Sequence, residues 1–134
     1  MFDKFFPDRY VASTYVIDFE GLYKEGVRGL IFDIDNTLVP HGAPADERAR
    51  ALFKRLKSIG FRCCLISNNQ KPRVEMFNKD IQVDYVYNAH KPSIRNYLKA
   101  MEIMGTDRDS TVFIGDQLFT DVWLSLIHIS EPTR

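Results

Sequence analysis

Two aspartates two residues apart are the side chains of this sequence whose spacing is best suited to chemistry. Asp33 and Asp35 come at the end of an apolar run, residues 27–34, and on an extended segment they would point to the same side. One carboxylate could then attack phosphorus and form an acyl phosphate. The other could protonate the leaving oxygen and later take a proton from water. An Asp-X-Asp pair taken alone also occurs in helix caps and turns, so this interpretation depends on the residues that accompany it.

Positive charge is required where two carboxylates and a phosphate share one site, because like charges oppose ionisation of their neighbours. Lys91, which precedes Pro92 at an expected helix start, supplies one cation. Mg²⁺ held by oxygen ligands from Asp33 and Asp116 would supply more positive charge. Outside this context Lys91 would be a solvated lysine, and Asp116 and Asp121 would be loop residues.

Hydrogen-bond donors for phosphoryl oxygens follow the second apolar run of the chain. Ser67 and the backbone N–H groups around Asn68 can donate such bonds, although Ser67-Asn68-Asn69 alone is also a turn or helix-cap signal. Thr37 can brace the loop that carries the two aspartates. His41 follows a proline in that loop and is interpreted as polar surface.

The elements that must position these residues are short apolar strands that alternate with amphipathic helices. This alternation predicts an α/β fold with a doubly wound, mostly parallel sheet. In such a sheet ligands bind beyond the carboxyl ends of the strands, and the polar residues described above follow those ends. The expected strands are residues 27–34, 61–67, 83–88 and 110–116, and the expected helices are 46–59, 71–78 and 92–104.

Composition places these elements in one globular unit. The chain has 134 residues, 45% of them hydrophobic, with 18 basic and 18 acidic side chains, which allows one domain. Zero net charge disfavours a general nucleic-acid partner. No apolar run reaches the length of a membrane span, and the adjacent Cys63 and Cys64 form neither a disulfide framework nor a metal-site spacing. We therefore expect a cytoplasmic protein with two core thiols.

Four motifs in this order resemble the haloacid dehalogenase (HAD) superfamily. More narrowly, DIDNTLVP, LISNN, HKP and IGDQLFTDV resemble the YqeG-type subclass IIIA phosphatases, a family similar to the mitochondrial phosphatidylglycerophosphate phosphatases. The resemblance covers residues 1 to about 123. The matching positions are Asp33, Asp35 and Thr37 for the first motif, Ser67 for the second, Lys91 for the third, and Gly115, Asp116 and Asp121 for the fourth.

The resemblance implies a role for each of these residues. Asp33 is implied as the nucleophile, Asp35 as the general acid/base, and Lys91 as the group that stabilises the aspartyl phosphate. The implied phosphate-binding residues are Ser67 and Asn68; the implied Mg²⁺ ligands are Asp33, the backbone carbonyl of Asp35, Asp116, and Asp121 directly or through water.

Three segments are expected along the chain: an N-terminal arm (1–26), the phosphatase core (27–123) and an atypical tail (124–134). The arm either packs on the sheet or makes a peripheral contact with a membrane surface. The tail lacks the Gly-rich loop, helix and strand that the resemblance implies, so we expect a chain truncated at this end. Within the tail, residues 125–130 alternate well enough to form a short edge strand.

Insertions that would cover the site are expected to be absent. The segment from Leu38 to Phe61 has room for one loop and one helix only, and the segment between Asn88 and Lys91 has no room for an insertion. A capless, open site suits a large or lipid phosphate ester better than a small metabolite. Two alternatives are a phospho-receiver signalling domain and a catalytically silent fragment. Receivers carry their phosphorylated aspartate after strand three, whereas the aspartate pair here follows strand one.

Overall fold

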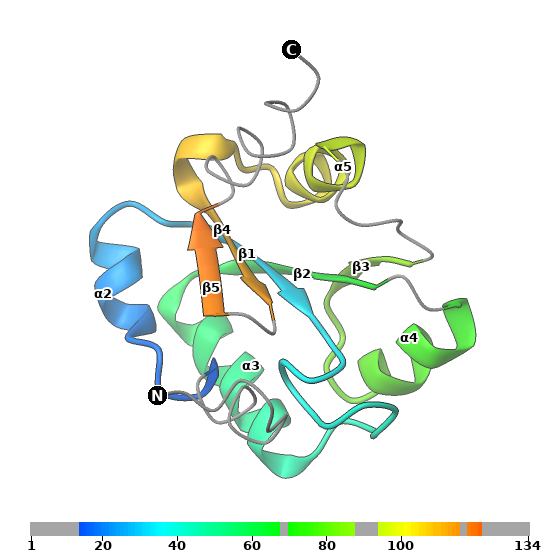
Figure 1. The fold of residues 1–134 in the computed structure, drawn as a ribbon. Helices are drawn as coiled ribbons and strands as arrows, with labels where there is room; N and C mark the ends of the chain where they lie inside the picture. The colour runs from blue at the N-terminus through cyan, green and yellow to red at the C-terminus, as the bar shows by residue number, and fades with distance from the viewer. Residues whose placement is uncertain (1–13, 68–69, 88–93, 116–117, 122–134) are drawn as a thin grey trace.

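The computed structural model describes residues 14–67, 70–87, 94–115 and 118–121, which form one sheet with helices on both faces (Figure 1). Within these residues the sheet has five strands in the order β3-β2-β1-β4-β5. The strands are β1 (Gly29–Asp33), β2 (Arg62–Ile66), β3 (Asp84–Val86), β4 (Thr111–Gly115) and β5 (Leu118–Asp121). The helices are α2 (Phe19–Lys24), α3 (Glu47–Ile59), α4 (Lys71–Asn78), α5 (Ile94–Met104) and the short 3₁₀ helix η1 (Arg108–Ser110).

Strand direction confirms the predicted mostly parallel sheet. The central strand β1 pairs in parallel with both β2 and β4, and β3 continues the parallel set beyond β2. Strand β5 differs, because it returns antiparallel to β4 and pairs Leu118 with Gly115. The sequence analysis predicted no strand there. The expected strand at residues 125–130 lies outside the described residues.

Helix ends follow the signals that the sequence contains. The Asp46 side chain accepts a hydrogen bond from the Ala49 N–H at 2.8 Å, which caps the first turn of α3. Gly60 ends the same helix with φ 121°, a left-handed conformation that other residues rarely adopt. Pro72 lies in the first turn of α4, where its missing N–H has no intrahelical acceptor to lose.

Alternation along the strands divides the core into two layers, which confirms the doubly wound arrangement. Leu30 and Phe32 of β1 face a cluster that includes buried side chains of α2, α3 and α4. Ile31 faces the opposite cluster, to which α5 contributes Tyr97 and three other buried residues. Both faces of β1 are therefore covered, and its functional positions are confined to its carboxyl end.

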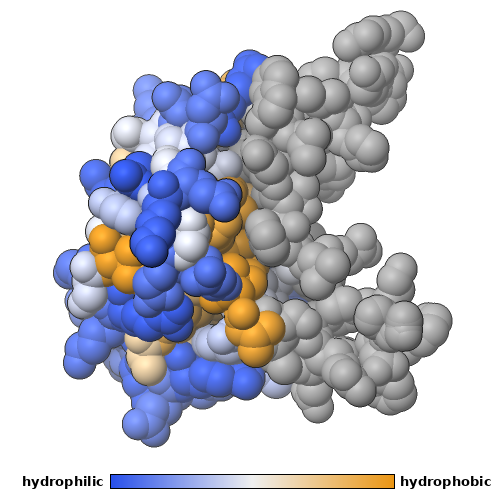
Figure 2. All heavy atoms as spheres, turned by 90° about the vertical axis from the view of Figure 1, so that its left-hand side faces the viewer, coloured by the Kyte–Doolittle hydropathy of each residue, from blue (hydrophilic) through white to orange (hydrophobic). Residues whose placement is uncertain are grey.

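The described part of the predicted arm packs against the sheet. Phe19 of α2 is fully buried and lies 6.3 Å from the Phe32 ring and 6.4 Å from the Phe61 ring. On the face of the molecule that carries α2, hydrophilic side chains surround smaller hydrophobic patches (Figure 2). Residues 1–13 and 122–134 lie outside the described part, so the membrane contact expected for the arm is not addressed there.

Membrane-spanning potential can be assessed for the helices that the structure describes. Among these, none has the combination of length and apolar character that crossing a bilayer requires.

Candidate active site

The carboxyl ends of three adjacent parallel strands define the candidate site. Asp33 is the last residue of β1, and its register partner in β2 is Ile66, directly before Ser67. On the other side Phe32 pairs with Ile114, so that Gly115 of β4 lies level with Asp33. Ser67 is buried, and its N–H donates to the Val86 carbonyl at 3.0 Å, which attaches it to the end of β3. The fold thus brings Asp33 and Ser67 to one edge of the sheet.

A tight turn follows β1 and carries Asp35. The Asn36 N–H donates to the Val39 carbonyl at 2.7 Å, and the Leu38 N–H donates to the Ile34 carbonyl at 3.0 Å. Asn36 adopts a left-handed conformation with φ 63°, which a short polar side chain tolerates better than most. The expectation that both aspartates lie on one extended segment is therefore wrong, because β1 ends at Asp33 and Asp35 lies in the turn that follows.

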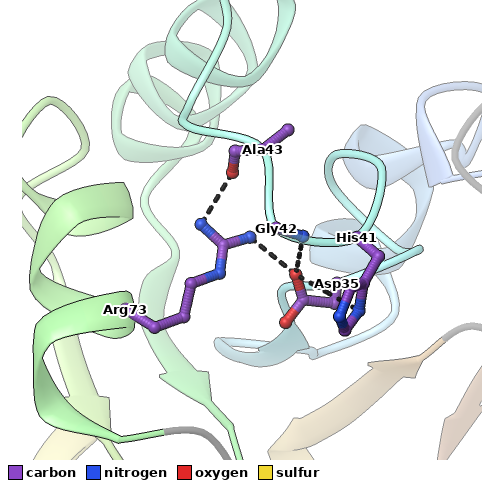
Figure 3. Close-up of polar contacts among 5 residues, drawn as sticks. All are labelled: Asp35, His41, Gly42, Ala43 and Arg73. Carbon is purple, nitrogen blue, oxygen red and sulfur yellow. Dashed lines mark hydrogen bonds and ion pairs between the residues drawn. The ribbon is translucent and has the colours of Figure 1, made fainter.

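The Asp35 carboxylate is bound by groups from two segments of the chain (Figure 3). Arg73 of α4 donates from Nη2 to Asp35 Oδ1 at 2.6 Å, and the Gly42 N–H donates to the same oxygen at 2.7 Å. The Nδ1 atom of His41 lies 4.0 Å from that oxygen. Arg73 also donates from Nη1 to the Ala43 carbonyl at 2.7 Å. Asp35 is therefore held in the connection between β1 and α3.

These contacts set the pKa of the Asp35 carboxyl below its usual range. Burial alone raises the pKa, because it penalises the charged form. The hydrogen bonds from Arg73 and from the Gly42 amide, together with the positive charge of Arg73, lower it by more than burial raises it. The contacts with Arg73 and Gly42 therefore favour the ionised form of Asp35.

Arg73 is a site residue that the sequence analysis missed. It lies in the first turn of α4, the helix that follows Ser67. The available signal was a basic residue in that turn, but the helical pattern had been used only for its apolar positions. His41, predicted as polar surface, is indeed exposed, with 77% of its side chain accessible.

Thr37 lies in the turn but has no contact that shows a role in binding. It is fully buried, and its Oγ1 has no hydrogen-bond partner in the described part of the chain. Its backbone N–H donates to the Ile34 carbonyl at 3.2 Å, which places the residue within the turn. The substrate-binding role of Thr37 therefore stays a prediction.

Asp121 is not brought to the same edge as Asp33. In β5 it pairs with Val112, which is itself level with Leu30. Three residues along a strand correspond to about 10 Å, so the backbone of Asp121 lies well toward the amino ends of the strands. The prediction of Asp121 as a metal ligand therefore has no support from the register.

Three further predicted residues, Asn68, Lys91 and Asp116, lie outside the described ranges. Asp116 follows Gly115 in the sequence, and Gly115 ends β4 level with Asp33. Among the described residues there is no group of three acidic, histidine or cysteine side chains able to hold a metal ion.

The Tyr97 side chain of α5 lies near enough to Asp33 for the charge of Asp33 to affect the pKa of Tyr97. Its ring packs edge-on against Phe113 at 5.4 Å, and the side chain is 4% exposed. Burial raises the pKa of Tyr97 to about 12, and the negative charge of Asp33 adds to the shift. This effect agrees with the alternation of β1, which turns Asp33 toward the same layer as Ile31.

A groove of about 700 Å³ lies elsewhere, between α3 and residues 80–84. Its lining includes Lys54, Lys57 and Arg62 but neither Asp33 nor Asp35. Because parallel α/β sheets place their reactive groups beyond the carboxyl ends of the strands, we locate the candidate site at Asp33 and not in this groove.

Comparison with known proteins gives a consistent assignment. Residues 43–123 match the family model of haloacid dehalogenase-like hydrolases. The chain is 37% identical over 124 residues to "Probable phosphatase YqeG" of Bacillus subtilis (strain 168), a match that covers 91% of this chain and 72% of that protein.

Solved structures show the same fold at low sequence identity. The "putative 3-deoxy-D-manno-octulosonate 8-phosphate phosphatase" of Vibrio cholerae aligns over 78% of this chain, with TM-score 0.58 and 19% identity. A hypothetical protein from Xanthomonas campestris aligns over 84% of this chain and 68% of its own length, with TM-score 0.58 and 20% identity. The match spans 64% of the Vibrio protein, a little less than two thirds of its length.

The family model and the YqeG match point to the same class of protein. Both favour an enzyme of the phosphatase class over the alternative of a receiver-like signalling domain. The family model covers more than half of the residues, and the identity to YqeG is well above that of the fold-level matches. The chain therefore belongs to the haloacid dehalogenase-like hydrolase family.

Proposed function

We propose that this chain is a Mg²⁺-dependent phosphomonoester hydrolase that acts through an aspartyl phosphate on Asp33. The observation that supports it most is the parallel register, which sets Asp33 at the end of the central strand beside Ser67. Asp35 lies two residues further, held at the same edge by contacts with Arg73 and Gly42. The residues that we propose as nucleophile, proton carrier and hydrogen-bond donor thus all follow the carboxyl ends of neighbouring strands or lie in the adjoining turn.

The proposed reaction has two steps, and each uses both aspartates. A carboxylate oxygen of Asp33 attacks phosphorus while the bond to the ester oxygen breaks, and Asp35, which has first taken a proton from solvent, gives that proton to the ester oxygen. A water molecule then attacks the phosphorus of the aspartyl phosphate, and Asp35 accepts the proton that the water loses. Inorganic phosphate leaves and the Asp33 carboxylate is restored.

A magnesium ion fits the donors that the site offers. Carboxylate and carbonyl oxygens are the ligands that Mg²⁺ prefers, and Asp33 presents a carboxylate level with Gly115, the residue before Asp116. We propose Asp33, Asp116 and the backbone carbonyl of Asp35 as its ligands. The ion would neutralise part of the negative charge that phosphate brings to two carboxylates. Asp121 is left out of this proposed set because of its register in β5.

Lys91, Ser67 and Asn68 complete the proposed phosphate site. Lys91 would contribute a second positive charge against the aspartyl phosphate, and Ser67 and Asn68 would donate hydrogen bonds to the phosphoryl oxygens. Ser67 has the burial and the fixed backbone that such a donor requires. Preorganised donors of this kind need no rearrangement when charge develops on the phosphoryl group.

We further propose a large or lipid substrate, with phosphatidylglycerophosphate as the leading candidate. The connection from β1 to α3, residues 34–46, contains turns and no separate domain that could cover Asp33. An open site can accept an ester at a membrane surface, and a peripheral contact through the N-terminal arm (1–26) would serve that purpose. A small metabolite would gain less from a site without a lid.

Phosphate release from a panel of esters tests the proposal. The full chain is assayed with phosphatidylglycerophosphate in mixed micelles, sugar phosphates and nucleotides, with Mg²⁺ or with EDTA. We expect turnover that requires Mg²⁺ and is fastest on the lipid. Asp33→Asn should lower kcat by at least about 1,000-fold, as removal of a nucleophile does, whereas Asp80→Asn, an exposed control, should not change it. Turnover by Asp33→Asn at the rate of the unmodified chain would exclude this mechanism.

A further inference from the structure

The contact between Arg73 and Asp35 indicates how the Asp35 carboxylate is oriented. We propose that Arg73 is a positioning residue, which fixes the Asp35 carboxylate and the loop around it for proton transfer to the leaving group. Arg73 donates one hydrogen bond from Nη2 to Asp35 Oδ1 at 2.6 Å and a second from Nη1 to the Ala43 carbonyl at 2.7 Å. A single guanidinium thus joins the carboxylate to a later point of the same loop (Figure 3).

Burial distinguishes this ion pair from the surface pairs of the molecule. The side chains of Arg73 and Asp35 are 13% and 15% exposed, so solvent and salt screen their attraction only weakly. The pair between Arg55 and Glu20 has a similar distance of 2.8 Å, but its side chains are 43% and 55% exposed. Exposed pairs contribute little fixed geometry, whereas the buried planar guanidinium restricts where the Asp35 carboxylate can turn.

Three of the groups that approach Asp35 meet the same oxygen. The Arg73 guanidinium, the Gly42 amide and the His41 ring lie at 2.6, 2.7 and 4.0 Å from Oδ1. These groups hold Oδ1 and so restrict how the Asp35 carboxyl can turn toward the leaving group. This inference rests on the proposed function, in which Asp35 is the general acid/base.

The origin of Arg73 in α4 connects it with the phosphate-binding end of β2. Ser67 directly follows that strand, and the next helix along the chain is α4, whose first turn carries Arg73. Ser67 and Arg73, close together in the chain, would therefore supply a donor for the phosphoryl oxygens and the residue that orients the Asp35 carboxyl. Positioning of this kind matters because a misplacement of about 1 Å can cost 100-fold in rate.

The dependence of rate on the leaving group tests the proposal with the full chain and Mg²⁺. A good leaving group such as dinitrophenolate departs without a proton, whereas the alkoxide of glycerol phosphate requires one. For Arg73→Met we expect kcat/KM on glycerol phosphate to fall by about 10- to 100-fold, a part of the usual effect of a general acid. The value on dinitrophenyl phosphate should change by less than about threefold. Arg73→Lys, which keeps one donor, should recover part of the loss.

Two further variants separate the possible results. Asp35→Asn should show the full leaving-group effect, and Arg55→Met, which removes an arginine–carboxylate pair on the surface, should show none. An equal loss on both esters with Arg73→Met, expressed as a higher KM, would mean that Arg73 binds phosphate and would overturn the positioning role. So would an Arg73→Met enzyme with the leaving-group profile of the unmodified chain. If Asp35→Asn itself lacks the effect, it is the proposed function that fails.

Discussion

Asp33 and Asp35 lie two residues apart but are held in place by different kinds of interaction. Asp33 belongs to a strand whose backbone is bonded to β2 and β4, so its position follows from the sheet. Asp35 lies in a turn, and side-chain and loop contacts with Arg73 and Gly42 hold its carboxylate. Changes to single side chains should therefore affect the proton transfer proposed for Asp35 more readily than the attack proposed for Asp33.

The buried hydroxyl of Thr37 leads to a prediction about stability. Its Oγ1 has no partner in the described part of the chain, and an unsatisfied buried polar group costs about 1–3 kcal/mol. Thr37→Val, which keeps the shape, should leave the free energy of unfolding unchanged or raise it by about 1 kcal/mol. Urea unfolding measures this. Thr111→Val is the control, because the Thr111 hydroxyl donates to the Asp107 carbonyl at 2.6 Å and its loss should destabilise the protein.

Activity of the same variant tests the binding role predicted for Thr37. If the hydroxyl contacts substrate, Thr37→Val should raise KM while the fold stays intact. A large loss of stability would instead show that the hydroxyl has a partner in the intact protein, contrary to the contacts described above.

The connection between β1 and α3 supplies both Asp35 and a backbone amide that binds its carboxylate. Gly42 adopts φ 80°, and the N–H of this residue donates to Asp35 Oδ1 at 2.7 Å. A residue with a side chain is strained in this conformation by about 1–2 kcal/mol. Gly26, at the end of α2, has φ 105° and also has open space around it, but it lies outside the site.

We predict that Gly42→Ala and Gly26→Ala lower the free energy of unfolding by similar amounts, about 1 kcal/mol each. Only Gly42→Ala should reduce kcat, because the strain moves an N–H that holds Asp35. Urea unfolding and phosphate release measure the two effects. Equal kcat in both variants would show that the Gly42 amide is not needed for the reaction.

Most elements could be predicted from the sequence because their signals are local. The apolar runs gave β1 to β4, and helix caps such as Asp46 and Gly60 marked the ends of α3. Strand β5 was missed because its four residues contain no apolar run, and its pairing with β4 is a tertiary event. Arg73 was missed for the same reason: its contact with Asp35 joins residues of two elements and depends on how α4 packs.

In the part of the molecule that the structure describes, helices cover both faces of the sheet and both cysteines are buried. Cys63 faces one layer and Cys64 the other. Burial raises the pKa of both thiols from 9.0 to about 12, and the charges of Cys64 and Asp84 add to the respective shifts. We predict that alkylating reagents modify these cysteines at pH 8 only after urea has unfolded the chain, as mass spectrometry would show. Modification of the native protein at the unfolded rate would contradict the two-layer packing.

The same pKa shifts predict the direction of the pH dependence of stability. A thiol whose pKa is higher in the folded than in the unfolded chain contributes fully to stability below the unfolded-state pKa near 9.0. That contribution is lost as the pH rises toward about 12. The melting temperature should therefore fall above pH 9, and the fall should be shallower in a Cys63→Ala, Cys64→Ala variant. Identical slopes would show that the thiols titrate alike in both states.

The central position of β1 in the sheet also implies that Asp33 and the loop beside Asp35 move at different rates. Amide protons of a strand bonded on both sides exchange only through openings close in free energy to global unfolding, and β1 has β2 and β4 on its two sides. Residues 40–44 lie in a surface loop, where smaller fluctuations suffice for exchange. Asp33, the proposed nucleophile, would then be fixed for almost the whole life of the folded molecule, while Asp35, the proposed proton carrier, responds to faster local motion. Sequence changes in that loop could tune the proton transfers proposed for Asp35 without cost to the strand that carries Asp33.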